Sequence, residues 1–91
     1  MISPQKAIEA ATKLVADIYG DDGARSVRVE ELDRVAKEGA WHVTLSFFPP
    51  SDLPDVSEAM RSILTPERIY KTFEVDAESG AVLSMKIREL Q

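Results

Sequence analysis

The segment AWHVTLSFF (residues 40–48) decides the fold of this chain. Apolar and polar side chains alternate along it, a period typical of a strand that buries one face and wets the other. Proline neither donates to a strand ladder nor continues one, so Pro49 ends the strand. We predict that the apolar face of this strand forms the floor of the core; its members are Trp41, Val43, Leu45 and Phe47.

A shorter alternation precedes this strand, around Val27 and Val29. The pattern breaks at Leu32, which points to the wrong side unless the strand bulges. The sequence therefore predicts a strand here and leaves open whether it reaches Val35. Acidic and basic side chains mix along residues 25–37, as on a solvated face or on an edge strand whose charges select a partner.

The end of the chain predicts a β-hairpin. Its first strand runs from Ile69 toward Asp76, and the five residues DAESG supply a turn in which Gly80 suits a left-handed backbone. The return strand alternates in the same way. The residues expected on the core face of the hairpin are Ile69, Phe73, Val75, Leu83, Met85 and Ile87.

Two helices are expected. The first spans residues 3–19, because Ser3 can cap its free amides, Pro4 suits its first turn and Gly20 can end it. The second is short and lies within residues 54–65, where apolar side chains recur at helical spacing. The apolar stripes comprise Ile8, Ala11, Leu14, Val15 and Ile18 in the first helix, and Val56, Ala59, Met60, Ile63 and Leu64 in the second.

These elements predict an α+β fold in the order α-β-β-α-β-β. A curved, four-stranded antiparallel sheet with both helices on one face would bury every apolar stripe. A chain of 91 residues can hold one core of this kind, so we expect a single domain over residues 1–91.

The composition disfavours several classes of function. With 16 acidic and 11 basic residues the net charge is −5, so nucleic acid is not an expected partner. The chain has no cysteine, which removes thiolate catalysis and zinc sites built on sulfur. No apolar run is long enough for a signal peptide or a membrane span. We therefore expect no membrane partner and a cytoplasmic location, although a chain restarted with Met after signal removal would look the same.

No catalytic set of residues emerges from the sequence. His42 is the only histidine, and nucleophilic catalysis needs a base held beside a nucleophile. We therefore expect a protein that is not an enzyme, with no catalytic residue, no metal ligand and no cofactor. His42 falls on the outward face of its strand, where a carboxylate across the sheet could contact it, and we retain it as a candidate binding residue.

The apolar candidates for a binding surface lie near the end of the central strand. Phe48 and Tyr70 fall opposite the core by simple alternation. With Pro49 and Pro50 they could form an exposed apolar patch of the kind that marks an interface. Distortion of the sheet at the proline loop could instead bury them, and the sequence leaves both outcomes open.

The segment YKTFEVDAESGAVL (residues 70–83) resembles the closing hairpin of PepSY-type domains, with an aromatic strand, Val-Asp-Ala, a Ser-Gly turn and an apolar return strand. These domains place a helix on a curved sheet and are cystatin-like in shape. The resemblance implies a noncatalytic module that binds or inhibits, in many members acting on peptidases. Such domains are usually exported or membrane-attached, whereas this chain shows no export signal, and it inserts residues 49–66 between its second and third strands.

The leading hypothesis is thus a small noncatalytic protein-binding or inhibitory module that acts through a sheet edge or an exposed sheet face. Its partner is a protein that the sequence does not identify, and a second copy of the chain is one candidate. The alternative is a cystatin-like cone that encloses a small apolar ligand or a minimal active site, with His42 or a carboxylate at its mouth.

Overall fold

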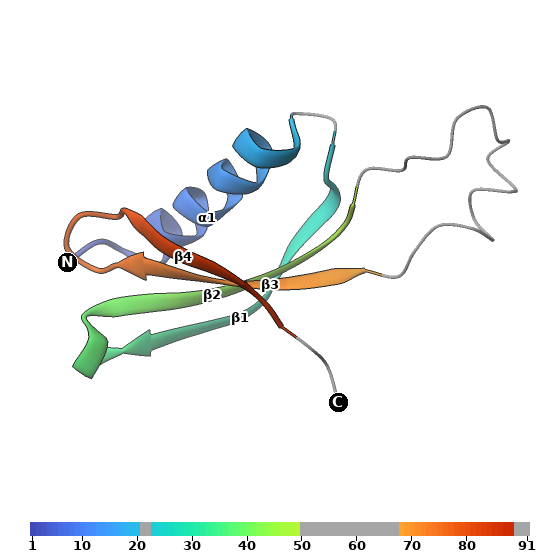
Figure 1. Cartoon of the computed structure of the whole chain (residues 1–91). Coiled ribbons are helices and arrows are strands. Elements are labelled where there is room, and N and C mark those ends of the chain that lie inside the picture. Colours follow the sequence, from blue (N-terminus) through green and yellow to red (C-terminus); the bar gives the residue numbers. More distant parts are fainter. Residues whose placement is uncertain (21–22, 50–67, 89–91) are drawn as a thin grey trace, which may run out of the picture.

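A computed structural model describes residues 1–20, 23–49 and 68–88 of the chain. It contains one N-terminal helix and a four-stranded antiparallel sheet in the order β1-β2-β3-β4 (Figure 1), which confirms the predicted α+β class and sheet. The second helix predicted within residues 54–65 lies outside the described residues. The elements are α1 (Pro4–Tyr19), β1 (Arg25–Val35), the 3-10 turn η1 (Ala36–Glu38), β2 (Ala40–Phe48), β3 (Ile69–Asp76) and β4 (Val82–Ile87).

Helix α1 begins and ends where the sequence predicts. The Ser3 hydroxyl accepts a hydrogen bond from the Lys6 amide at 3.2 Å, and Gly20 ends the helix with φ of 83°. Ile18, predicted on the buried stripe, is instead 49% exposed. In this last turn of the helix Tyr19, and not Ile18, packs against the sheet: the centre of its ring lies 5.4 Å from the centre of the Phe47 ring.

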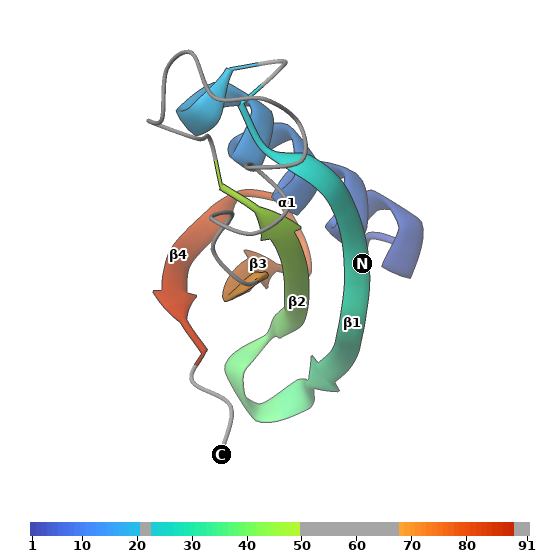
Figure 2. The same cartoon turned by 90° about the vertical axis from the view of Figure 1, so that its right-hand side faces the viewer.

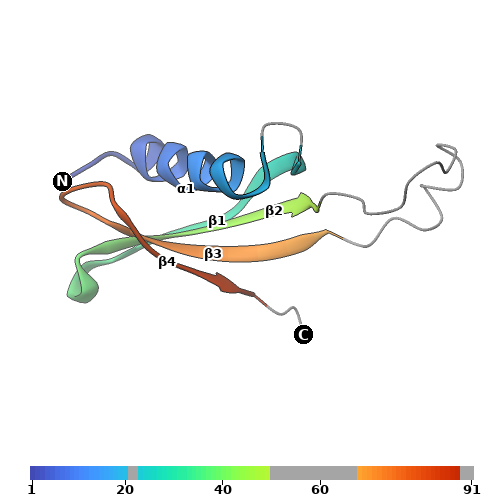
Figure 3. The same cartoon turned by 45° about the horizontal axis from the view of Figure 1, so that its top comes forward.

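The core lies between α1 and the two inner strands of the sheet (Figure 3). We call this side of the sheet the helix face. Its side chains fill the space under the helix, and burial of apolar surface is the dominant favourable contribution to folding. The fully buried members are Ala7, Ala11 and Val15 from α1, and Val43, Leu45, Phe47, Phe73 and Val75 from the sheet.

Strand β1 reaches Val35 and is irregular along its length. Its register with β2 shifts between Arg25 and Arg28 and again between Val29 and Glu31, and this second shift, just before Leu32, is the bulge that the sequence left open. Ser26 has a φ of 54°, a left-handed backbone that is costly for residues with a side chain.

The β3–β4 hairpin is confirmed, and the side chain of Asp76 organises its turn. Asp76 Oδ1 accepts hydrogen bonds from the amides of Glu78 and Ser79 at 2.8 and 2.9 Å. These bonds from Ser79 and Glu78 hold the pKa of the Asp76 carboxyl below its ordinary value.

The hairpin also corrects a prediction, because two of the residues expected in the core are exposed. Leu83 is 55% exposed and Ile87 is 72% exposed. Both belong to β4, the outermost strand, whereas α1 lies chiefly over the inner strands. The alternating pattern correctly predicted that Met85 lies on the core face, because Met85 is opposite Phe73 and packs against the core.

The face of the sheet opposite α1, which we call the distal face, is concave. Figure 2 shows β1 and β4 bending on either side of the inner strands. On this face Thr44 and Ser46 are buried, and the Thr44 hydroxyl lies 2.9 Å from that of Thr72. Glu31 of β1 and Arg88, just after β4, form an ion pair across the same face. In a flat sheet these outer strands would be about 14 Å apart, so the contact reflects the curvature.

Candidate functional site

The two outer strands of the sheet differ in charge and regularity. Strand β1 carries two register shifts and a left-handed residue, Ser26. Irregularity and charge are the usual means by which proteins prevent an edge strand from pairing with another chain. Strand β4 has a single shift, beside Leu83, and Lys86 is its only charged residue. The charged residues of β1 are Arg25, Arg28, Glu30, Glu31, Asp33 and Arg34.

The backbone N–H and C=O groups of alternate residues in β4 point away from the sheet. Ser84 and Lys86 lie opposite Glu74 and Thr72 of β3, and the amide of Arg88 continues this ladder by donating to Tyr70. In an antiparallel pair, residues that exchange hydrogen bonds alternate with residues whose backbone groups point the other way. The paired residues of β4 whose backbone groups point outward are therefore Met85 and Ile87, and no described strand pairs with this edge. Leu83 precedes them and has no partner at the register shift.

Met85 and Ile87 carry apolar side chains on the helix face, and Leu83 beside them is apolar and exposed. Met85 lies opposite Phe73 and is partly buried, while the side chains of Leu83 and Ile87 extend beyond the cover of α1. An edge with unpaired backbone groups and exposed apolar side chains is a template for a further strand. We refer to the outward side of β4, from Leu83 to Ile87, as the β4 edge.

The predicted apolar patch lies on the distal face at the far end of β2. Phe48, Pro49 and Tyr70 are each half-buried, and Pro50 lies outside the described residues. The guanidinium of Arg68 sits 4.6 Å from the centre of the Phe48 ring, a cation–π contact. The structure thus brings Phe48 and Tyr70 onto one face, and their role in binding remains a prediction.

Beside this patch, a polar network joins β1 to β2. The Ser46 hydroxyl donates to Glu30 Oε2 at 2.7 Å, and Arg68 donates to the Ser46 hydroxyl at 3.0 Å. Arg68 also donates to the carbonyl oxygen of Ser26 at 2.7 Å. The hydrogen bond from Ser46, aided by nearby Arg28, lowers the pKa of Glu30. This network accounts for the burial of Ser46 on a face that would otherwise be wet.

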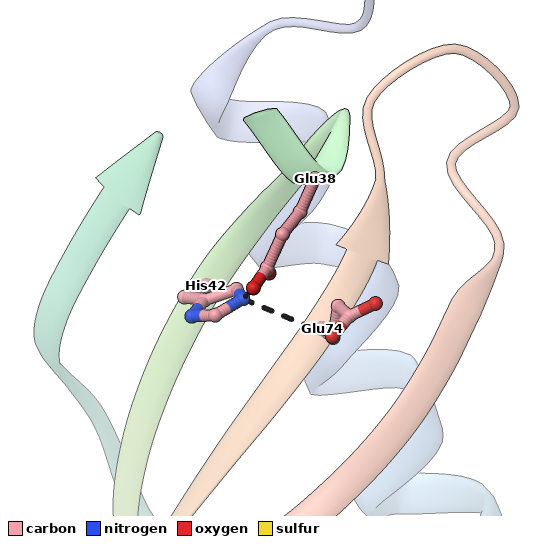
Figure 4. Close-up of side chains that lie close together, drawn as sticks. All are labelled: Glu38, His42 and Glu74. Carbon is pink, nitrogen blue, oxygen red and sulfur yellow. Dashed lines mark hydrogen bonds and ion pairs between the residues drawn. The ribbon is translucent and has the colours of Figure 1, made fainter. Parts of the chain in front are cut away.

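His42 lies at the opposite end of the distal face, between two carboxylates (Figure 4). Its Nε2 is 2.8 Å from Glu38 Oε2 and 3.9 Å from Glu74 Oε1. Glu74 is the cross-strand partner of His42 on β3, and η1 brings Glu38 over the ring. The predicted carboxylate across the sheet is therefore Glu74, whereas Glu38 was not foreseen.

Chemically, this cluster offers one imidazole nitrogen and two carboxylates, with donor atoms that all lie within 4.8 Å of one another. Such donors could hold a cation such as Zn²⁺. The contacts are equally those of a histidine shared by two acidic neighbours, and the side chains are 32–43% exposed. No sequence motif marked the group, because its members meet only through the strand register and the turn.

A shallow depression of about 170 Å³ lies near the end of α1 and the start of β1. Its lining includes Val15 of the core and does not include His42. The residues that line the depression are Thr12, Val15, Ala16, Gly20, Ala24 and Val27.

In the described part of the chain, no helix is long and apolar enough to cross a membrane.

Comparison with known proteins returns no match to a family model, a curated protein or a solved structure.

Proposed function

We propose that this protein is a noncatalytic protein-binding module that takes an extended polypeptide segment along the β4 edge. The observation that carries the proposal is the contrast between the outer strands. Strand β1 is charged and irregular, whereas the β4 edge presents outward-directed backbone groups beside the exposed side chains of Leu83 and Ile87. The resemblance of residues 70–83 to PepSY-type hairpins, which implies binding or inhibition, supports the same proposal.

Strand addition would satisfy both features of this edge. A segment laid antiparallel or parallel to β4 would hydrogen-bond to the backbone of Met85 and Ile87. Its alternate side chains would cover Leu83 and Ile87 on the helix face. The affinity would come from the main-chain ladder and the specificity from the apolar side chains, with Lys86 favouring an acidic or neutral residue on the distal face.

A displayed library of short random peptides tests this proposal. Peptides selected on the wild-type protein should bind at least tenfold more weakly to the double variant Leu83→Lys, Ile87→Lys, because charges on this edge oppose strand addition. Both side chains are exposed, so the fold should tolerate the change. Val29→Lys is the matched control on β1, since Val29 is 43% exposed.

Peptides that bind the double variant and the wild type equally would contradict the proposal, as would a library that enriches no binder on the wild-type protein. The selection is run at a protein concentration low enough to keep the chain monomeric, so that self-association does not occupy the edge.

A further inference from the structure

We infer that the occupant of the β4 edge is a second copy of this chain, paired antiparallel to β4 about a twofold axis at Met85. This inference rests on the proposed function, because it assigns a partner to the same edge. It follows from three constraints, which come from the backbone, the apolar side chains and the single charge of β4.

The backbone constraint limits which residues can face each other. Within the regular part of β4, only Met85 and Ile87 direct their backbone groups outward, because Ser84 and Lys86 belong to the ladder with β3. Two copies can therefore exchange hydrogen bonds only when an outward residue of one faces an outward residue of the other. This rule removes every register that sets an outward residue against an inward one.

The apolar side chains favour the register centred on Met85. In this register Met85 faces the partner's Met85, and Leu83 faces the partner's Ile87. These side chains lie on the helix face, so each exposed apolar residue would gain an apolar neighbour. Leu83 and Ile87 are 55% and 72% exposed in the single chain, and pairing would cover both.

The charge of Lys86 disfavours one competing register. A shift that centres the pairing on Lys86 would set it directly against the partner's Lys86, and like charges directly opposite are destabilising. Centring on Met85 sets Lys86 against the partner's Ser84 instead. The net charge of −5 acts against association at long range, but salt screens it beyond about 8–10 Å.

The twofold axis is perpendicular to the sheet, so the product is one continuous sheet with both helices on the same face.

Cysteine crosslinking tests the register, and the absence of native cysteine removes any background. In the inferred dimer Ser84 and the partner's Lys86 form a non-hydrogen-bonded pair, with Cα atoms about 4.5 Å apart, which is within disulfide reach. Oxidised glutathione should therefore crosslink a mixture of Ser84→Cys and Lys86→Cys chains, and neither variant alone. Val29→Cys on β1 is the matched control and should remain uncrosslinked.

Light scattering on the wild-type chain should give twice the 10.1 kDa chain mass at high concentration. Crosslinking of Lys86→Cys alone would overturn the Met85 register, and a doubled mass without crosslinking of the mixture would overturn the β4 interface. A chain that stays monomeric at millimolar concentration, while peptides still bind the β4 edge, would overturn the second-copy inference and leave the proposed function standing. Peptide binding that ignores Leu83→Lys, Ile87→Lys would count against the proposed function itself.

Discussion

Strands β1 and β4 occupy equivalent places at the two ends of one sheet, yet they meet solvent differently. Strand β1 is eleven residues long, bulged and charged, and its Ser26 adopts a left-handed backbone. Strand β4 is six residues long, with one charge and two exposed large apolar side chains. The difference indicates that one edge is protected against pairing and the other is left suited to it, which overall composition does not reveal.

The largest effect is expected from the inner strands, on which both edges depend. Phe73→Ala would remove a fully buried ring behind Met85 and leave a cavity, which should cost about 3–5 kcal/mol of unfolding free energy. Urea denaturation measures the loss. Phe48→Ala, at a half-buried ring on the distal face, is the control and should cost less than half as much; an equal loss would contradict the placement of the core.

A single charge on β4 should remove the difference in pairing between the two edge strands. Ile87→Glu should raise the dissociation constant of the inferred dimer by about tenfold or more, because a carboxylate would replace the side chain that faces the partner's Leu83. Sedimentation equilibrium measures the constant. Val29→Glu on β1 should leave it unchanged, and an equal effect of the two changes would show that association does not distinguish the edges.

The irregularity of β1 can be tested at Ser26. Its φ of 54° is tolerated by glycine and disfavoured for β-branched residues, so Ser26→Val should destabilise the fold by about 1–2 kcal/mol. Ser26→Gly should be neutral or stabilising in the same urea titration. If valine were tolerated as well as glycine, β1 would not require a left-handed residue at this point.

The smallest effect is expected at the turn that presents β4. The pKa of Asp76 is lowered in the folded state, so its ionised form stabilises the hairpin above the ordinary value of 3.8, and this contribution is lost as pH falls through the folded pKa. Asp76→Ala should lower the thermal midpoint at neutral pH by about 5 °C and reduce its acid dependence. Asp33→Ala on β1 is the control, and an unchanged acid dependence in Asp76→Ala would contradict this role of the turn.

The sequence predicted the elements whose side chains alternate strictly or carry capping residues. Strand β2, the β3–β4 hairpin and the limits of α1 are confirmed, because local spacing alone determines them. Leu83 and Ile87 were wrongly placed in the core. Alternation identifies the side of a sheet on which a residue lies, whereas exposure depends on strand order and on how far α1 reaches.

The candidate sites show the same limit. The sequence left open whether a carboxylate across the sheet contacts His42, because identifying Glu74 required the β2–β3 register, and Glu38 required the geometry of the η1 turn. The β4 edge was not singled out from the sequence either, because a single strand does not reveal whether a neighbour lies on its other side. The Phe48 and Tyr70 patch remains a prediction.

The ion pair between Glu31 and Arg88 has a consequence for how the molecule responds to its solution. Arg88 follows Ile87 directly, so the chain that presents the β4 edge also tethers it to β1 across the distal face. The two side chains are 45% and 39% exposed, and dissolved salt screens such pairs. High ionic strength is therefore expected to weaken this one side-chain link between the two ends of the sheet.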